Sequence, residues 1–259
     1  MPKTKANGIE DLIHDMEDEI SDLKNNYVVY GPNGAGKTTF VSYLQQMMNL
    51  FFIDAEGGRS SIIKTPNKPK IFQPKSDEPD MLREAYVYLK AHEDEYDAVA
   101  IDTMTEIEQW FIDDVIRTQC KRDPNKDKDL ATQSDYNKAS MRMRRTARLF
   151  RDLDIVTVFI MHIREDKDES KGVINYSPAV MPSVFRDINS FTDFIFYLGL
   201  DKNSNRNILT QPTKNFVAKH RIGDLPDSIK LGKKVENCRM DKVLKMIDKT
   251  KGQKKGDDK

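Results

Sequence analysis

The 259-residue chain carries 42 Lys and Arg against 42 Asp and Glu, so its formal net charge is zero. This length can bury a substantial core, and 12 Gly with 11 Pro exclude low-complexity and collagen-like classes. No apolar run reaches the ~18 residues that a membrane-spanning helix needs, and the first residues lack the apolar region of a secretory signal. Cys120 and Cys238 suit neither a disulfide framework nor a metal cluster. We therefore expect a cytoplasmic protein without a membrane partner.

Apolar periodicity predicts strands and helices that alternate along most of the chain. An acidic segment with apolar residues at helical spacing comes first, at 9–23. The strands are expected at 27–30, 50–54, 97–102, 155–161 and 193–200. The helices are expected at 39–49, 79–92, 105–120 and 135–152. This alternation predicts an α/β fold with a mainly parallel sheet flanked by helices.

Polar loops and short strands complete the expected organisation. Segments 121–131 and 164–172 are expected to be polar loops. Short strands near 207–211 and 215–219 could pair as a hairpin, which would be an antiparallel extension of the sheet. The expected boundaries are an acidic helical segment at 1–26, a main α/β domain at 27–232 and a disordered Lys-rich tail at 233–259.

One motif indicates a site for nucleotide phosphates. The run from Gly31 to Thr38 satisfies G-x-x-x-x-G-K-[ST] in full. Its glycines let successive backbone N–H groups point at phosphate oxygens. Lys37 would reach the β- and γ-phosphates, and the Thr38 hydroxyl would ligate Mg²⁺. The expected nucleotide-binding residues are Gly31, Pro32, Asn33, Gly34, Ala35, Gly36, Lys37, Thr38 and Thr39.

Polar residues also follow the predicted strands where these end. In a parallel α/β sheet the carboxyl ends of the strands meet at one edge, where ligands bind. Asp54 and Glu56 follow the second strand, Asp102 follows the third, and His162 follows the fourth. Together with the phosphate loop, these side chains predict a reaction site at that edge.

Each candidate also has a purely structural alternative. Asp102 could hold Mg²⁺ or cap the following helix. Glu56 could act as the general base or be a solvated carboxylate in a Glu-Gly-Gly turn. His162 could contact the γ-phosphate or be a neutral, hydrogen-bonded core histidine. Lys219 and Arg221 could reach a neighbouring subunit's nucleotide as cationic fingers or lie in solvent at a strand end.

The ordered motifs resemble the phage RecA-like nucleotide-binding proteins, including the Sak-type single-strand-annealing ATPases. The series comprises GPNGAGKTTF, FIDAEGG, AIDTMTEI, a basic helix, VFIMHIRED and VAKHRIGDLPD, and it covers most of residues 27–228. The resemblance implies a RecA-type core in which the His162 strand lies between the strands that end at the phosphate loop and at Asp102. It also implies Glu56 as catalytic base, His162 in place of a glutamine sensor, and Lys219 with Arg221 as trans-acting cations.

The chain also departs from RecA in two respects. It lacks a match to RecA's C-terminal domain, and its acidic N-terminal segment is no obvious match to the polymerisation arm. Ring, filament and monomer therefore stay open.

A basic helix raises the question of DNA binding. Six cations and no anion occur across residues 138–151 of the helix predicted at 135–152: Lys138, Arg142, Arg144, Arg145, Arg148 and Arg151. The zero net charge therefore permits a local DNA site while excluding a uniformly basic coat. In RecA-like proteins the loops corresponding to 121–131 and 164–172 line DNA, but both also carry acids here, and no aromatic residues interleave with the cations. The alternative is a solvated face that pairs with Asp113, Asp114 or Asp135.

These observations favour a Mg²⁺-dependent ATPase of phage DNA recombination that acts on single-stranded DNA as a homo-oligomer, with a phage or host single-strand-binding protein as a possible partner. A nucleotide-gated assembly factor with negligible turnover and a helicase- or packaging-type motor remain alternatives. A small-molecule kinase is disfavoured because no arginine-rich lid segment follows the fourth strand. No base-recognition motif separates ATP from GTP.

Overall fold

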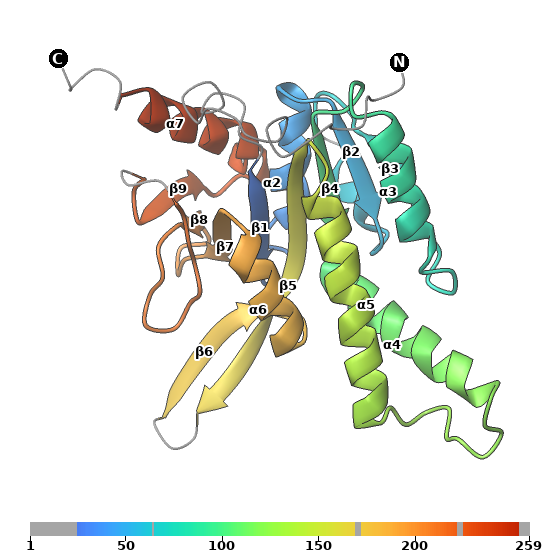
Figure 1. The fold of residues 1–259 in the computed structure, drawn as a ribbon. Coiled ribbons are helices and arrows are strands. Elements are labelled where there is room, and N and C mark those ends of the chain that lie inside the picture. Colours follow the sequence, from blue (N-terminus) through green and yellow to red (C-terminus); the bar gives the residue numbers. More distant parts are fainter. Residues whose placement is uncertain (1–24, 64, 169–171, 222–224, 254–259) are drawn as a thin grey trace, which may run out of the picture.

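A computed structural model, shown in Figure 1, describes residues 25–63, 65–168, 172–221 and 225–253. The predicted acidic helical segment at 1–26 lies almost wholly outside the described residues. Among the residues that are described, no helix is long and apolar enough to cross a bilayer.

A nine-stranded sheet forms the centre of the molecule, in the order β3-β2-β4-β5-β1-β7-β8-β9, with β6 paired to β5. The strands are β1 (Asn26–Gly31), β2 (Leu50–Asp54), β3 (Lys70–Phe72), β4 (Ala98–Asp102), β5 (Val156–Asp168), β6 (Val173–Pro178), β7 (Phe194–Leu200), β8 (Arg206–Leu209) and β9 (Ser228–Gly232). The first six strands in this spatial order, β3, β2, β4, β5, β1 and β7, are parallel to one another. Strands β6, β8 and β9 pair antiparallel with their neighbours. The predicted fold class is confirmed, and β5 lies between β1 and β4 as the resemblance implies.

Helices cover both faces of the sheet. The helical elements are α2 (Lys37–Ser42), η2 (Tyr43–Gln46), η3 (Gly58–Ser61), α3 (Met81–Ala91), α4 (Met104–Cys120), α5 (Gln133–Arg151), α6 (Pro182–Phe191), η4 (Val235–Asn237) and α7 (Met240–Gln253). One buried cluster joins α3 to α6 with one sheet face, and a second joins α2 and α7 with the other. Successive residues of β1 alternate between the clusters, Val28 and Tyr30 in the first, Tyr27 and Val29 in the second. Burial on both faces explains strands that are apolar throughout.

Two expected loop and hairpin assignments are wrong. Residues 164–168 of the expected loop 164–172 are strand, because β5 continues to Asp168 and pairs with β6 from Ile163↔Pro178 to Asp168↔Val173. Hydrogen bonds to β6 satisfy the backbone of this part of β5, so it needs no buried apolar face. Its charged composition therefore does not indicate a strand in the sequence. The predicted hairpin of 207–211 with 215–219 is absent, since β8 pairs with β7 and β9 instead. Within 215–219 only isolated bridges occur.

The expected disordered tail from residue 233 is also wrong for the part that is described. Helix α7 buries Met240, Val243, Leu244 and Ile247 in the cluster it shares with α2. These residues follow i, i+3, i+4, i+7 spacing, which is the apolar stripe of an amphipathic helix. The many lysines around them lower the mean hydropathy of the segment and conceal this stripe.

Two arms project beyond the sheet, on the side to which the parallel strands run (Figure 1). One is the β5–β6 hairpin, and the other is the pair α4 and α5 with their connecting loop. The loop 121–131 contains neither helix nor strand, as expected. Thr132 and Asp135 form a capping box that starts α5.

Glu108 of α4 fixes the start of α6. Its two carboxylate oxygens lie 2.8 and 2.9 Å from the backbone nitrogen of Met181, the residue that precedes α6 and donates this hydrogen bond. Burial raises the pKa of Glu108 to about 7, although the Met181 hydrogen bond and the nearby Arg164 charge oppose the shift. The carboxyl group is therefore stabilised in its protonated form in the folded chain.

This shift predicts a pH-dependent contribution to stability. A carboxyl whose pKa is raised on folding contributes stability that is complete below its unfolded pKa, near 4.3, and is lost as the pH rises through about 7. Relative to Glu108→Gln, the wild type should lose on the order of 2–3 kcal/mol of unfolding free energy between pH 5 and 8. Urea unfolding of both proteins at each pH measures this. Parallel pH profiles for the two proteins would contradict it, and Glu84→Gln on exposed α3 provides the control.

Candidate functional site

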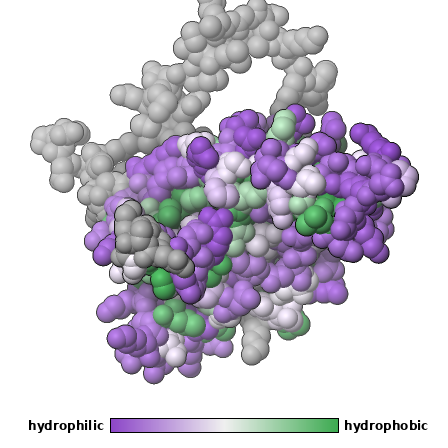
Figure 2. Space-filling view, turned by 90° about the horizontal axis from the view of Figure 1, so that it is seen from below, coloured by the Kyte–Doolittle hydropathy of each residue, from purple (hydrophilic) through white to green (hydrophobic). Residues whose placement is uncertain are grey.

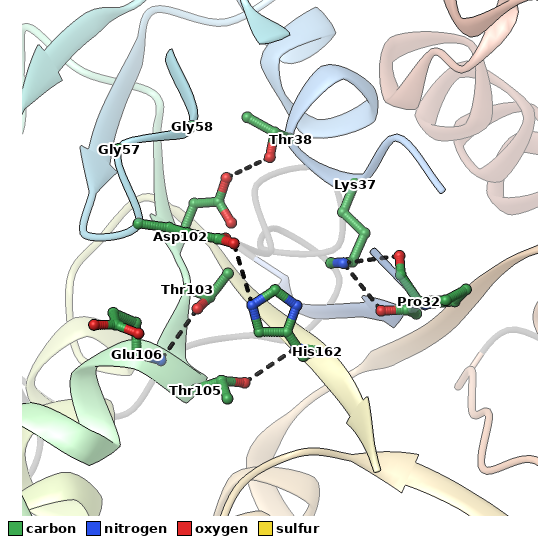
Figure 3. A network of polar contacts seen from close by, with 12 residues as sticks. Pro32, Lys37, Thr38, Gly57, Gly58, Asp102, Thr103, Thr105, Glu106 and His162 are labelled. Carbon is green, nitrogen blue, oxygen red and sulfur yellow. Dashed lines mark hydrogen bonds and ion pairs between the residues drawn. The ribbon is translucent and has the colours of Figure 1, made fainter. Parts of the chain in front are cut away.

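The phosphate loop connects β1 to α2. A Cβ at Gly31 would lie 2.0 Å from the carbonyl oxygen of Leu198, so only glycine fits this approach of β1 to β7. Gly36 has a φ of 98°, in the left-handed region that favours glycine. The buried Lys37 ammonium donates to the carbonyl oxygens of Gly31 and Pro32 at 3.0 and 3.1 Å (Figure 3). Gly31 thus allows a close approach of two strands, and Gly36 allows a positive φ. The Lys37 side chain folds back across the loop.

An open pocket of about 500 Å³ lies against this loop. Its lining residues are Asn33, Gly34, Gly36, Lys37, Thr38, Thr39, Glu56, Gly58, Ser60, Ser61, His162 and Val235. This volume lies within the usual range of small-molecule sites. Six of the nine expected nucleotide-binding residues line the pocket, while Gly31, Pro32 and Ala35 belong to the loop but not to this lining.

Thr38 of the pocket lining contacts Asp102, which lies behind it and is not itself a lining residue, although the two are 64 positions apart. The Thr38 hydroxyl donates to Asp102 Oδ2 at 2.6 Å (Figure 3). Asp102 is 1% exposed, and its Oδ1 is buried without a hydrogen-bond partner among the described residues. Burial raises the pKa of Asp102 to about 7, an effect that the carboxylates of Glu56 and Asp54 increase and that Thr38 and Lys37 oppose. A cation that binds oxygen would lower this electrostatic cost.

The donor set fits Mg²⁺ with nucleotide. Mg²⁺ commonly takes one or two protein ligands together with substrate phosphates and water. Within the described ranges, no group of three or more His, Cys, Asp or Glu could hold a metal ion. Thr38 and Asp102 are the expected metal ligands, and the unpartnered Oδ1 provides a free acceptor for one.

The alternative of Asp102 as a helix cap is wrong. Thr103 is the N-cap of α4, and its hydroxyl accepts a hydrogen bond from the Glu106 backbone N–H at 3.2 Å (Figure 3). The Glu106 carboxylate in turn accepts one from Trp110 Nε1 at 2.9 Å. The Asp102 carboxylate is therefore not used to cap α4.

Glu56 and His162 face each other across the pocket. Glu56 Oε1 lies 3.4 Å from His162 Nε2, and the two side chains are 41% and 24% exposed. The backbone N–H of His162 donates to the Thr105 hydroxyl at 3.0 Å, which ties β5 to the start of α4 (Figure 3). Burial and the Lys37 charge lower the pKa of His162, while Glu56 opposes that shift. His162 is thus a pocket residue rather than a core histidine, and Glu56 has a partner.

Lys219 and Arg221 lie at the opposite edge of the sheet. The backbone of Lys219 pairs with Ile195, near the amino end of β7, and its ammonium donates to the Asn189 carbonyl at 2.7 Å. Arg221 forms an ion pair with Asp193 at 2.8 Å. Because β7 runs parallel to β1, this end of β7 is remote from the phosphate loop. The structure therefore does not bring these two cations to their own chain's pocket.

The C-terminal segment contributes residues that sequence reasoning misses. Val235 lines the pocket, and its Cγ2 would lie 3.2 Å from a Cβ at Gly36. Arg206 Nε donates to the Ala35 carbonyl at 2.9 Å, so β8 supports the phosphate loop. Cys238 is buried against the same loop, and burial raises the pKa of its thiol to about 12. No sequence motif marks these residues. The apolar stripe of α7 is the one feature of the sequence that indicates a folded C-terminal segment.

Ion pairs divide the six cations of α5 into two groups. The pairs are Arg142 with Asp114 and Asp80, Arg148 with Asp187, and Arg151 with Asp152. The other three, Lys138, Arg144 and Arg145, form no ion pair with another described residue. The expected pairing with acidic neighbours thus holds for Asp114, whereas Asp135 binds Lys126 of the loop.

A groove between α4 and α5 collects four cations, of which Arg122, Lys138 and Arg145 form no ion pair with another described residue and Arg142 does. It encloses about 290 Å³, and its lining residues are Val115, Thr118, Gln119, Arg122, Lys138, Met141, Arg142 and Arg145. No carboxylate belongs to this lining. Lys138 and Arg145 lie seven positions apart on the same face of α5, together with exposed Met141 between them. The groove is therefore a positively charged surface on one of the two arms.

A protein-family model matches most of the chain. A family model described as an AAA domain, AAA_24, matches residues 23–222. No curated protein matches the chain at a significant level. The matched range includes the phosphate loop, the strand that ends at Asp102, the strand that carries His162, and both arms.

Proposed function

Because the chain belongs to the AAA-domain family and has the α/β core of P-loop NTPases, we propose that it binds ATP with Mg²⁺ and hydrolyses it. The observation that carries this proposal is the Thr38–Asp102 pair with its unpartnered carboxylate oxygen. Lys37 and Glu56 line the same pocket, so a cation for the phosphates and a base for water lie around one space.

The residues divide the reaction between them. Lys37 transfers its ammonium hydrogen bonds from the loop carbonyls to the β- and γ-phosphates. Glu56 accepts a proton from the attacking water as its oxygen bonds to the γ-phosphorus. The bond from the γ-phosphorus to the β–γ bridging oxygen breaks, giving ADP and inorganic phosphate, and the proton passes from Glu56 to solvent. Thr38 and Asp102 would hold Mg²⁺, which would supply positive charge to the phosphate oxygens when bound.

A nucleotide-gated binding protein with negligible turnover is the second candidate. It is favoured by the contact of Glu56 with His162, which engages the carboxylate that must accept the proton. His162 also begins the part of β5 that continues into the β5–β6 hairpin, so nucleotide could control that arm without hydrolysis. Rates of ATP hydrolysis with and without single-stranded DNA separate the two candidates.

We propose single-stranded DNA as the partner of the arms. Both arms project on the side to which the parallel strands run (Figure 1), and the face seen from their ends is mostly hydrophilic with small apolar patches (Figure 2). Arg122, Lys138 and Arg145 border the α4–α5 groove without an acidic neighbour in its lining. Lys138 and Arg145 lie roughly 10 Å apart along α5, so they can contact separate phosphates of one strand.

We further propose a homo-oligomer that acts in the cytoplasm, in phage recombination or single-strand annealing. Lys219 and Arg221 lie at the amino edge of the sheet, so they can reach only a nucleotide bound by a neighbouring copy. A head-to-tail arrangement, in which one amino edge meets the next carboxyl edge, would provide this and would give a ring or a filament. Light scattering with and without ATP tests the assembly.

Substitutions in the pocket should separate binding from hydrolysis. Lys37→Ala should lose both, because its ammonium contacts the phosphates. Glu56→Gln should bind Mg²⁺-ATP normally while its kcat falls on the order of 10²-fold or more, the usual effect of removing a general base. Calorimetric ATP binding and phosphate release measure the two properties, with Glu84→Gln as a control outside the pocket. Hydrolysis at the wild-type rate by Glu56→Gln would remove the assigned base.

Substitutions in the groove should weaken DNA binding selectively. Lys138→Ala with Arg145→Ala should lower affinity for single-stranded DNA and reduce the slope of log K against log salt by about 0.7 for each lost phosphate contact. Arg148→Ala with Arg151→Ala is the matched control, since both arginines are held in ion pairs. Fluorescence anisotropy of a labelled oligonucleotide over a salt series measures the slope. Equal slopes for the two double variants would argue against the groove.

A further inference from the structure

Two aspartates end adjacent strands side by side, with different partners. Asp54 of β2 and Asp102 of β4 are register partners and are 2% and 1% exposed. Asp54 Oδ1 accepts hydrogen bonds from the backbone N–H groups of Gly57 and Gly58 at 2.8 and 2.9 Å. Asp54 Oδ2 accepts one from Gln73 Nε2 at 3.1 Å. Both oxygens of Asp54 are therefore engaged within the chain, whereas Asp102 keeps one free.

The hydrogen bonds of Asp54 close the turn that carries Glu56. At the start of the turn, the N–H groups of Ala55 and Glu56 donate to the Asp102 carbonyl at 2.7 and 3.2 Å. At its end, the N–H groups of Gly57 and Gly58 donate to the Asp54 carboxylate. The backbone of Glu56 is thus held from both sides, by the ends of two neighbouring strands.

The same turn lies against the expected metal ligands. A Cβ at Gly58 would be 3.8 Å from Thr38 Oγ1 and 4.0 Å from Asp102 Oδ2. Gly57 has a φ of 79°, in the left-handed region, so the chain reverses direction there (Figure 3). A shift of this turn would change the distance from Glu56 to the phosphates held by Thr38 and Lys37.

We propose that Asp54 is a positioning residue for hydrolysis, which acts by fixing the Glu56 turn at its catalytic distance. The inference rests on the proposed function, in which Glu56 is the base. Asp54 is no metal ligand in this proposal, because the turn and Gln73 occupy its oxygens. Gln73 Oε1 accepts from Arg59 at 2.9 Å, which fixes the amide so that its NH₂ group faces Asp54.

A positioning role predicts a change in kcat with little change in nucleotide affinity. Asp54→Ala should lower kcat by ~10–100-fold, because displacement of a reacting group by about 1 Å has effects of this size. Its ATP dissociation constant should stay within ~3-fold of wild type, since the phosphate loop is intact. Asp54→Asn keeps one acceptor oxygen for the turn but places an NH₂ group toward Gln73. Its kcat should fall by ~3–10-fold, between that of Asp54→Ala and wild type.

A double variant tests whether Asp54 acts through Glu56. Asp54→Ala combined with Glu56→Gln should hydrolyse ATP no more slowly than Glu56→Gln alone, because two residues that act as a unit are not additive. Asp201→Ala is the matched control: Asp201 Oδ1 also accepts two backbone N–H groups, of Asn203 and Asn205, but in a turn outside the pocket. Its kcat should match wild type.

The outcomes separate this inference from the proposed function. Wild-type hydrolysis by Glu56→Gln would remove the base and with it the proposed mechanism. An inactive Glu56→Gln with a fully active Asp54→Ala would overturn the positioning role alone, as would additive losses in the double variant. If thermal melting shows that Asp54→Ala does not fold, Asp54→Asn decides, and a wild-type kcat for it would overturn the inference.

Discussion

The parallel pairing of β2 with β4 places two carboxylates side by side at one edge of the sheet, and the site depends on how their charge is accommodated. Burying an ionised carboxylate is costly unless hydrogen bonds or opposite charges compensate it. Asp54 is compensated by a turn of backbone N–H groups and by Gln73, and Asp102 only in part, by Thr38. Asp54, with both oxygens hydrogen-bonded, therefore holds the backbone of the turn, whereas Asp102 keeps an oxygen that can bind a cation.

Short, rigid connections link this edge to the two arms. Helix α4 begins at Met104, two residues after Asp102, with Thr103 as its cap. Strand β5 carries His162 at the pocket and then continues directly into the β5–β6 hairpin. Glu108 connects α4 to the start of α6, which follows that hairpin in the chain. A change at the pocket therefore has continuous elements through which it can reach both arms, and this geometry supports nucleotide control of a partner.

Local features could be predicted from the sequence because they depend on neighbouring residues. The phosphate loop is specified by glycines whose torsions other residues adopt poorly, as at Gly36. The strands that end at Asp54 and Asp102, and the part of β5 that leads to His162, are continuous apolar runs, so their existence could be read directly. The longer β5 could not, because its extension is stabilised by pairing with β6 rather than by burial.

The sequence by itself determined the phosphate loop, the α/β alternation and the set of polar residues at the strand ends, since each follows from local torsions or from apolar periodicity. Only the tertiary structure decided which residues share the site and which cations are free. Arg206 reaches Ala35 over 171 positions, Val235 enters the pocket from beyond the expected domain, and Lys219 lies at the far edge. On α5, the carboxylates of Asp114 and Asp187 select which arginines are paired. Such contacts join elements distant along the chain, and packing and charge pairing set them rather than any spacing within a motif.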